Sequence, residues 1–169
     1  MTSRIYDWWL QISVDYNKKY TPTAYFYYDN IVNIGHILNA YDKNANTRIT
    51  KYPAVFLLSS IKEQVRVDTS ILFKPLILIV AESKRDYLFN ERQENTYKPT
   101  LYPIYEGLKS TLAPYGFKDH IKYDRDYISG ALKEQSLHSG LSNLFNDSLD
   151  GIEIREGTIV LRERCTKIR

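Results

Sequence analysis

The first apolar pattern of the chain has helical spacing. Between residues 3 and 18, large apolar side chains recur every three or four positions: Ile5, Trp8, Trp9, Ile12 and Tyr16. Positions with this spacing fall on one face of an α-helix. The pattern therefore predicts an amphipathic helix over about 3–18. A shorter stripe of the same kind, from Ile31 to Tyr41, predicts a second helix.

Three segments in the next part of the chain are typical of strands. Residues 54–58 are short and wholly apolar, and residues 61–67 alternate apolar with charged side chains. Residues 70–82 form the most hydrophobic segment, so we expect them to be the central strand, covered on both faces. Pro75 has no backbone donor, which places it at the start of that strand or at a bulge.

Helical spacing returns from Asn90 to Leu112, where Pro99 and Pro103 predict a kink or a restart. Residues 117–147 are polar and rich in tyrosine, and we expect an extended loop region there. Apolar residues on either side of Glu156 and Gly157 predict a hairpin or bulged pair over 152–163 that closes the sheet.

Together these elements predict an α+β fold, with a single small mixed or antiparallel sheet packed against two to three helices. No repeat, linker or low-complexity segment divides the 169 residues, so we expect a single domain over 1–169 with its sheet and helix core at about 52–112. A chain of this length buries a continuous core without disulfides or metals.

The composition departs from the average in its aromatic content. Aromatic residues make up 14% of the chain and 15 of them are tyrosines, whereas the hydrophobic fraction of 43% is ordinary. A tyrosine ring offers a large contact area, and its hydroxyl can remain hydrogen-bonded to water at the edge of a contact. Tyrosine is therefore enriched at protein interfaces. Two interpretations stay open: tyrosines at the margin of the core, or tyrosines in a protein–protein interface.

Charge and cysteine content restrict the partners. The net charge is +3 without any block of like charges, and the densest basic stretch is C-terminal: Arg162, Arg164, Lys167 and Arg169. This stretch leaves open a basic nucleic-acid-binding module that uses tyrosine stacking. The single Cys165 cannot form an internal disulfide, and its role stays open. We expect no signal peptide and no membrane span, hence a soluble protein.

Catalytic patterns do not fit the chain, so we expect no enzyme, no cofactor and no metal. His36, His120 and His138 lie far apart, and no glycine-rich phosphate loop is present. The best enzymatic alternative is a metal-dependent nuclease, with Asp150 and Glu153 as ligands and Arg155 nearby. Arginine stays protonated and serves poorly as a base, and a solvated strand edge is the other interpretation of these acids.

The order of motifs resembles the neck and tail-completion (tail-terminator-like) proteins of tailed bacteriophages, especially those of gut Bacteroidota phages. The resemblance covers most of the chain: the N-terminal amphipathic helix, YPAVFLL at 52–58, the strand at 76–82, Glu91-Arg92 leading into YKPTLYPIY at 97–105, and LFND at 144–147 through LDGIEI at 149–154. It implies a structural virion protein, made in the host cytoplasm, that forms a homo-oligomeric ring of six or twelve copies at the head-tail junction.

The resemblance also implies the partners of the chain. They are other neck, portal or tail proteins, and DNA passes through the lumen of the ring without specific binding. Interface anchors are large aromatic or arginine side chains in segments without core periodicity. The candidate subunit-interface residues are Tyr25, Tyr27, Tyr28, Tyr87, Phe89, Arg92, Tyr97, Tyr123, Tyr127 and Phe145.

Overall fold

The computed structural model contains three main helices and eight strands in the part of the chain that it describes. That part comprises residues 2–41, 43, 51–59, 61, 63–66, 70–84, 86–117, 126–128, 147–154 and 157–162. The N-terminal elements are α1 (Thr2–Lys19), β1 (Tyr25–Asp29) and α2 (Ile31–Tyr41). The predictions of both helices are confirmed, and the aromatic segment between them forms an additional strand.

A five-stranded mixed sheet forms the centre of the molecule, in the order β1-β2-β5-β7-β6. Its other strands are β2 (Ala54–Leu58), β5 (Ile77–Glu82), β6 (Asp126–Ile128) and β7 (Leu149–Ile154). β1 pairs with β2 in parallel, and the other neighbours are antiparallel. β2 and β5 are buried on both faces, which explains their continuous apolar sequences.

A second, three-stranded antiparallel sheet has the order β3-β4-β8, with β3 (Glu63–Val65), β4 (Ile71–Phe73) and β8 (Ile159–Leu161). It continues the central sheet, because the chain passes directly from β4 into β5 and from β7 towards β8. Ile77 faces Ile154 and Phe73 faces Ile159, so β4 and β5 pair with β8 and β7 in the same antiparallel sense.

The α+β class, with mixed and antiparallel strands against helices, is confirmed, but two details differ from the sequence prediction. The single sheet is divided into two, and segment 70–82 is two strands separated by residues 74–76, which include Pro75. The predicted hairpin of the last two strands is wrong, since β7 pairs with β5 and β6 and β8 pairs with β4. Adjacent apolar segments indicated a hairpin, but the long-range antiparallel pairing of β4–β5 with β7–β8 prevails.

The third helical segment runs without a break from Phe89 to Leu112. It consists of α3 (Phe89–Arg92), a π-helical stretch η2 (Gln93–Leu101) that contains Pro99, and α4 (Tyr102–Leu112) with Pro103 in its first turn. The wider π-helical turns take up the proline whose ring would clash in a regular α-helix. A short 3₁₀ helix, η3 (Ala113–Tyr115), follows and ends at Gly116, whose φ of 74° favours glycine.

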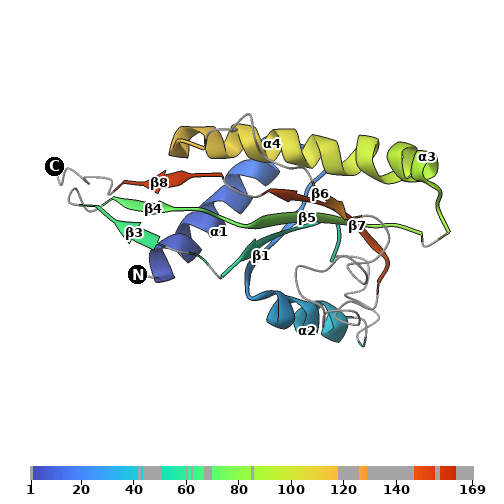
Figure 1. The fold of residues 1–169 in the computed structure, drawn as a ribbon, viewed down its shortest axis with the longest axis horizontal. Coiled ribbons are helices and arrows are strands. Elements are labelled where there is room, and N and C mark those ends of the chain that lie inside the picture. Colours follow the sequence, from blue (N-terminus) through green and yellow to red (C-terminus); the bar gives the residue numbers. More distant parts are fainter. Residues whose placement is uncertain are drawn as a thin grey trace.

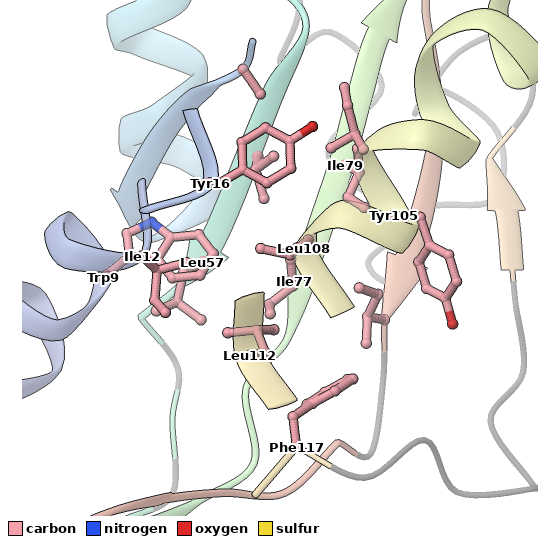
Figure 2. Packing of buried hydrophobic residues seen from close by; sticks show 14 of the residues in the cluster. Trp9, Ile12, Tyr16, Leu57, Ile77, Ile79, Tyr105, Leu108, Leu112 and Phe117 are labelled. Carbon is pink, nitrogen blue, oxygen red and sulfur yellow. The ribbon is translucent and has the colours of Figure 1, made fainter. Parts of the chain in front are cut away.

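The two faces of the central sheet are covered differently. α1 and α4 pack on one face, and their apolar side chains meet Leu57, Ile77 and Ile79 of the sheet in the larger cluster (Figure 2). α2 packs on the other face through Ile34 and Leu38, and Figure 1 shows it opposite α4. Each fully buried Leu or Ile side chain contributes roughly 1.5–3 kcal/mol of transfer free energy, so both layers hold the sheet in place.

The approach of α1 to α4 depends on a glycine. A Cβ at Gly107 would lie 2.8 Å from the Tyr16 ring and 2.9 Å from the Tyr20 ring, so any side chain there would displace these rings. A hydrogen bond also joins α1 to β1: the Trp9 indole N–H donates to the Tyr27 carbonyl over 3.0 Å. The N-terminal helix is therefore fixed at both the sheet and α4.

Most of the region predicted as an extended loop, 117–147, lies outside the described residues. Within it the structure describes Phe117, the short strand β6 and Asp147. β6 forms the edge of the central sheet beside β7.

Candidate subunit-contact surface

The loop between β5 and α3 presents two large apolar side chains to the solvent. Leu88 is 74% exposed and Phe89 is 73% exposed, the highest values among the large apolar residues that the structure describes. Both lie at the start of α3, at one end of the long axis of the molecule (Figure 1). We call the pair Leu88 and Phe89 the apolar tip.

The guanidinium group of Arg92 binds this loop on its buried side. Its Nε–H donates to the Tyr87 carbonyl over 3.0 Å, and Nη1 donates to Ser83 Oγ over 3.3 Å. Nη1 also forms an ion pair with Asp150 Oδ1 of β7, in the central sheet. Arg92 thereby joins the end of β5, the loop and β7, and it fixes the backbone directly before the apolar tip.

The first turn of α3 is stabilised as well. The Glu91 carboxylate accepts a hydrogen bond of 2.7 Å from the Leu88 backbone N–H, one of the groups that a helix start leaves without a partner inside the helix. Glu91 also carries negative charge near this helix start, where it is favourable. The apolar tip therefore protrudes from a backbone that is held by hydrogen bonds on both sides.

The Arg92–Asp150 pair is buried. Arg92 is 8% exposed and Asp150 is fully buried, beside Ala81 on the face of the sheet that carries α4. Removing two charges from water is costly, and only their attraction together with further hydrogen bonds compensates for that cost. Arginine suits this position because its planar fork donates in several directions at once.

Asp150 and Glu153 do not form the metal site of the nuclease alternative. β7 is paired without interruption from Leu149 to Ile154, so residues three apart project from opposite faces of the sheet. Asp150 lies on the face of α4, and Glu153 lies on the face of Leu78 and Leu149. The solvated-edge interpretation is wrong too, because β7 has neighbours on both sides and both acids are buried. Arg155 lies outside the described residues.

A second charged pair lies at the same end of the sheet, on the other side. Lys51, only 2% exposed, forms an ion pair with Asp147, and the Tyr52 hydroxyl donates to Asp147 Oδ2 over 3.1 Å. Asp147 lies two residues before the start of β7, and Lys51 and Tyr52 lie shortly before β2. This pair fixes the start of both strands.

The candidate interface residues differ in their exposure to solvent. Tyr25 is 42% exposed, whereas Tyr27 and Tyr28 are half-buried against the helices. Burial, with Tyr41 and Tyr25 nearby, raises the pKa of Tyr27 to about 12. Tyr87 is half-buried, with the Lys84 ammonium 5.5 Å from the centre of its ring.

Two of these candidates need correction as direct contact residues. Tyr97 is 2% exposed and belongs to the larger cluster, because the helical run turns its side chain towards the sheet. Arg92 is a positioning residue, since its guanidinium group lies in the interior. Tyr123 and Phe145 lie outside the described residues, and for Tyr127 the structure describes only the backbone, in β6.

Sequence reasoning identified Tyr87, Phe89 and Arg92 as candidates but missed Leu88 and the partner of Arg92. A signal for the partner was present: the acid of LDGIEI stands in an otherwise apolar strand, and a buried carboxylate requires a cation. It also missed Lys51, which follows a stretch without a predicted element.

Other chemistry has little support in the described residues. Among them no group of three or more His, Cys, Asp or Glu side chains is arranged to hold a metal ion. His36 is exposed on α2, and His120 and His138 lie outside the described part. No described helix combines the length and apolar character that crossing a membrane requires.

The chain matches no protein-family model and no curated protein with which it was compared.

Proposed function

We propose that this chain is a structural virion protein of a tailed bacteriophage, a subunit of a ring at the head-tail junction. Such a ring joins portal-side to tail-side components, and DNA passes through its lumen. The resemblance of the sequence to neck and tail-completion proteins suggests this role. The α+β fold agrees with the fold that the resemblance implies.

The observation that carries the proposal is the apolar tip on its fixed loop. Leu and Phe side chains that stay exposed to water gain no hydrophobic free energy from burial. Contiguous exposed apolar side chains are typical of contact sites. A contact that is already ordered before binding loses less entropy on association. The buried Arg92–Asp150 pair orders this loop, which is what a subunit that associates through Leu88 and Phe89 requires.

A second exposed apolar surface supports an assembly with more than one neighbour. Tyr6, Leu10 and Val14 lie four residues apart on α1 and are 44–46% exposed. Tyr6 extends this stripe to the central sheet, because its ring lies 6.0 Å from the ring of Tyr28 in β1. A ring subunit contacts both lateral neighbours and the rings above and below, so it needs several such surfaces.

The number of copies per virion tests the proposed function. Quantitative mass spectrometry of purified particles, scaled to the major capsid protein, measures this number. We expect a constant six or twelve copies. A chain that is absent from particles, or present in a variable number, would contradict the proposal.

A further inference from the structure

The central sheet ends on one side at β1, whose outer edge offers backbone groups for a further strand. The Tyr25 N–H donates to the Pro53 carbonyl over 2.9 Å, so Tyr25 and every second residue after it bond to β2. The alternate residues, Phe26 and Tyr28, direct their N–H and C=O groups away from the sheet. Among the residues that the structure describes, none forms a hydrogen bond with either group of Phe26. Such an edge is a template for an added strand.

The side chain of Asn17 closes this edge at one position. Its amide nitrogen donates to the Ala24 carbonyl over 3.0 Å, and its amide oxygen accepts from the Ala24 N–H over 2.9 Å. These two bonds replace the pair that a neighbouring strand would form. A strand that adds to β1 therefore pairs at Phe26 and cannot extend its pairing to Ala24.

The same edge lies beside the exposed stripe of α1, which consists of Tyr6, Leu10 and Val14. Asn17 follows Val14 by three residues, hence on the same side of the helix, and it reaches the outer groups of Ala24. At the other end of the stripe, the Tyr6 ring lies 6.0 Å from the ring of Tyr28. A strand added to β1 would therefore contact an apolar helix face as well as the open edge.

The opposite edge of the sheet, β6, offers matching groups. The Ser83 N–H donates to the Ser148 carbonyl over 2.9 Å, in register with the antiparallel ladder of β5 and β7. Bonding directions alternate along a strand, so even residues of β7 bond to β5 and odd residues bond to β6. Positions 126 and 128 lie opposite odd residues and bond to β7, which leaves the N–H and C=O of Tyr127 directed outwards.

The two edges also match in direction. β1 runs parallel to β2, and each of the next three steps, to β5, β7 and β6, reverses the direction. β6 therefore runs opposite to β1. Two copies placed side by side in the same orientation bring β6 of one copy antiparallel to β1 of the other.

The pleat of the sheet restricts the register of this pairing. Position 127 lies opposite Ile152, on the face of the larger cluster, and Phe26 belongs to the same face, with its ring 5.2 Å from the Trp9 ring. Residues that lie directly opposite each other point to the same face. Position 127 of one copy therefore fits opposite Phe26 of the next, where both residues offer outward groups.

From these observations we infer that β6 of one copy pairs with β1 of the next, with Tyr127 opposite Phe26, so that the central sheet continues between subunits. The contact joins two different edges and is heterologous. Repeated heterologous contacts close into a ring when the rotation between subunits permits. The inference rests on the proposed function, and it names a lateral contact of the ring beside that of the apolar tip.

A disulfide between copies tests this pairing. With Phe26 opposite Tyr127, position 25 lies opposite position 128 in a non-hydrogen-bonded pair. The Cα atoms of such a pair are about 4.5 Å apart, within the range that a disulfide spans. Positions 25 and 128 lie on opposite edges of the sheet within one chain, so this disulfide forms only between copies.

The test chain carries Tyr25→Cys and Ile128→Cys, and all chains carry Cys165→Ser. The matched control carries Val65→Cys with Ile128→Cys, because Val65 is 49% exposed on β3, an edge of the other sheet. After mild oxidation we expect a ladder of linked chains from the test chain, roughly tenfold stronger than from the control, since a disulfide needs close Cα atoms. Chains with Tyr25→Cys alone should give no linked species.

A second measurement changes the backbone of β1 and leaves β6 intact. Phe26→Pro removes the outward N–H, which the sheet of its own chain does not use, and proline is tolerated at such edge positions. Phe26→Leu is the matched control, because it removes the same ring and keeps the N–H. We expect Phe26→Pro to associate about tenfold more weakly than Phe26→Leu, measured by native mass on dilution, because a carbonyl of the next copy loses its donor.

Three results would overturn the inference. They are linked dimers from Tyr25→Cys alone, a ladder no stronger than that of the control, and equal association of the two Phe26 variants. Circular dichroism verifies the fold of each variant, and the Phe26 comparison decides where Ile128→Cys does not fold. The copy number in virions separates this failure from failure of the proposed function, because six or twelve copies without the 25–128 disulfide mean a ring that uses other surfaces.

Discussion

Removing the guanidinium group of Arg92 tests the account of the loop that carries the apolar tip. Arg92→Met keeps most of the side-chain volume but leaves the fully buried Asp150 carboxylate without this cation. Breaking a buried ion pair in this way costs about 3–5 kcal/mol. The hydrogen bonds to Tyr87 and Ser83 are lost as well, each worth about 1 kcal/mol, although such contributions do not simply add.

We therefore expect Arg92→Met to lower the free energy of unfolding by about 4 kcal/mol. Urea unfolding followed by far-UV circular dichroism measures this value. With a slope of about 2 kcal/mol/M, the midpoint moves down by about 2 M. Arg92→Lys keeps the charge but not the fork, so it should lose a smaller part of the same stability.

A matched control lies six residues further along the same helical run. Lys98→Met breaks the ion pair with Glu94, in which both side chains are more than half exposed, and an exposed pair four residues apart on a helix contributes about 0.3–0.5 kcal/mol. A second readout is cleavage by chymotrypsin after Tyr87, Leu88 or Phe89, which should be faster in Arg92→Met. A loss below about 1 kcal/mol with unchanged cleavage would refute the role of Arg92.

Three further predictions concern the core. Gly151→Ala places a Cβ 2.9 Å from the backbone carbonyl oxygen of Ile79, which cannot move aside, so we expect a loss of about 1–3 kcal/mol in urea unfolding. Burial raises the pKa of Tyr16 from 10.0 to about 12, and the unfolded chain loses this proton first. The free energy of unfolding should therefore fall as pH rises from about 10 to 12, by about 1.4 kcal/mol per pH unit from this residue, and Tyr16→Phe should remove that contribution. Trp9→Phe removes the 3.0 Å hydrogen bond to the Tyr27 carbonyl and part of a fully buried ring, and we expect more than about 1 kcal/mol of lost stability.

Local periodicity was sufficient to predict α1, α2 and the buried strand β2. α1 differs by one residue at each end from the predicted 3–18, and β2 coincides with the predicted 54–58. These segments are long or strongly apolar, so their own sequence determines their structure. Pairing was not predictable in the same way, because β8 pairs with β4, about 90 residues earlier, and not with its neighbour in sequence.

The candidate site shows the same division between local and long-range information. Composition identified the segment around Tyr87 and Phe89, because aromatic residues without core periodicity are visible in the sequence. It did not separate Phe89, which is exposed, from Tyr97, which is buried eight residues later. That difference depends on which side of the helical run meets the sheet, and only the tertiary packing determines it.

The native mass of the purified chain tests the central claim, assembly through the apolar tip, most directly. The measurement compares the wild-type chain with Leu88→Ser/Phe89→Ser, a variant whose free energy of unfolding should change by no more than about 0.5 kcal/mol because both side chains are exposed. We predict a closed oligomer of six or twelve copies for the wild type and a monomer for the variant. Equal masses for the two folded proteins would contradict the account.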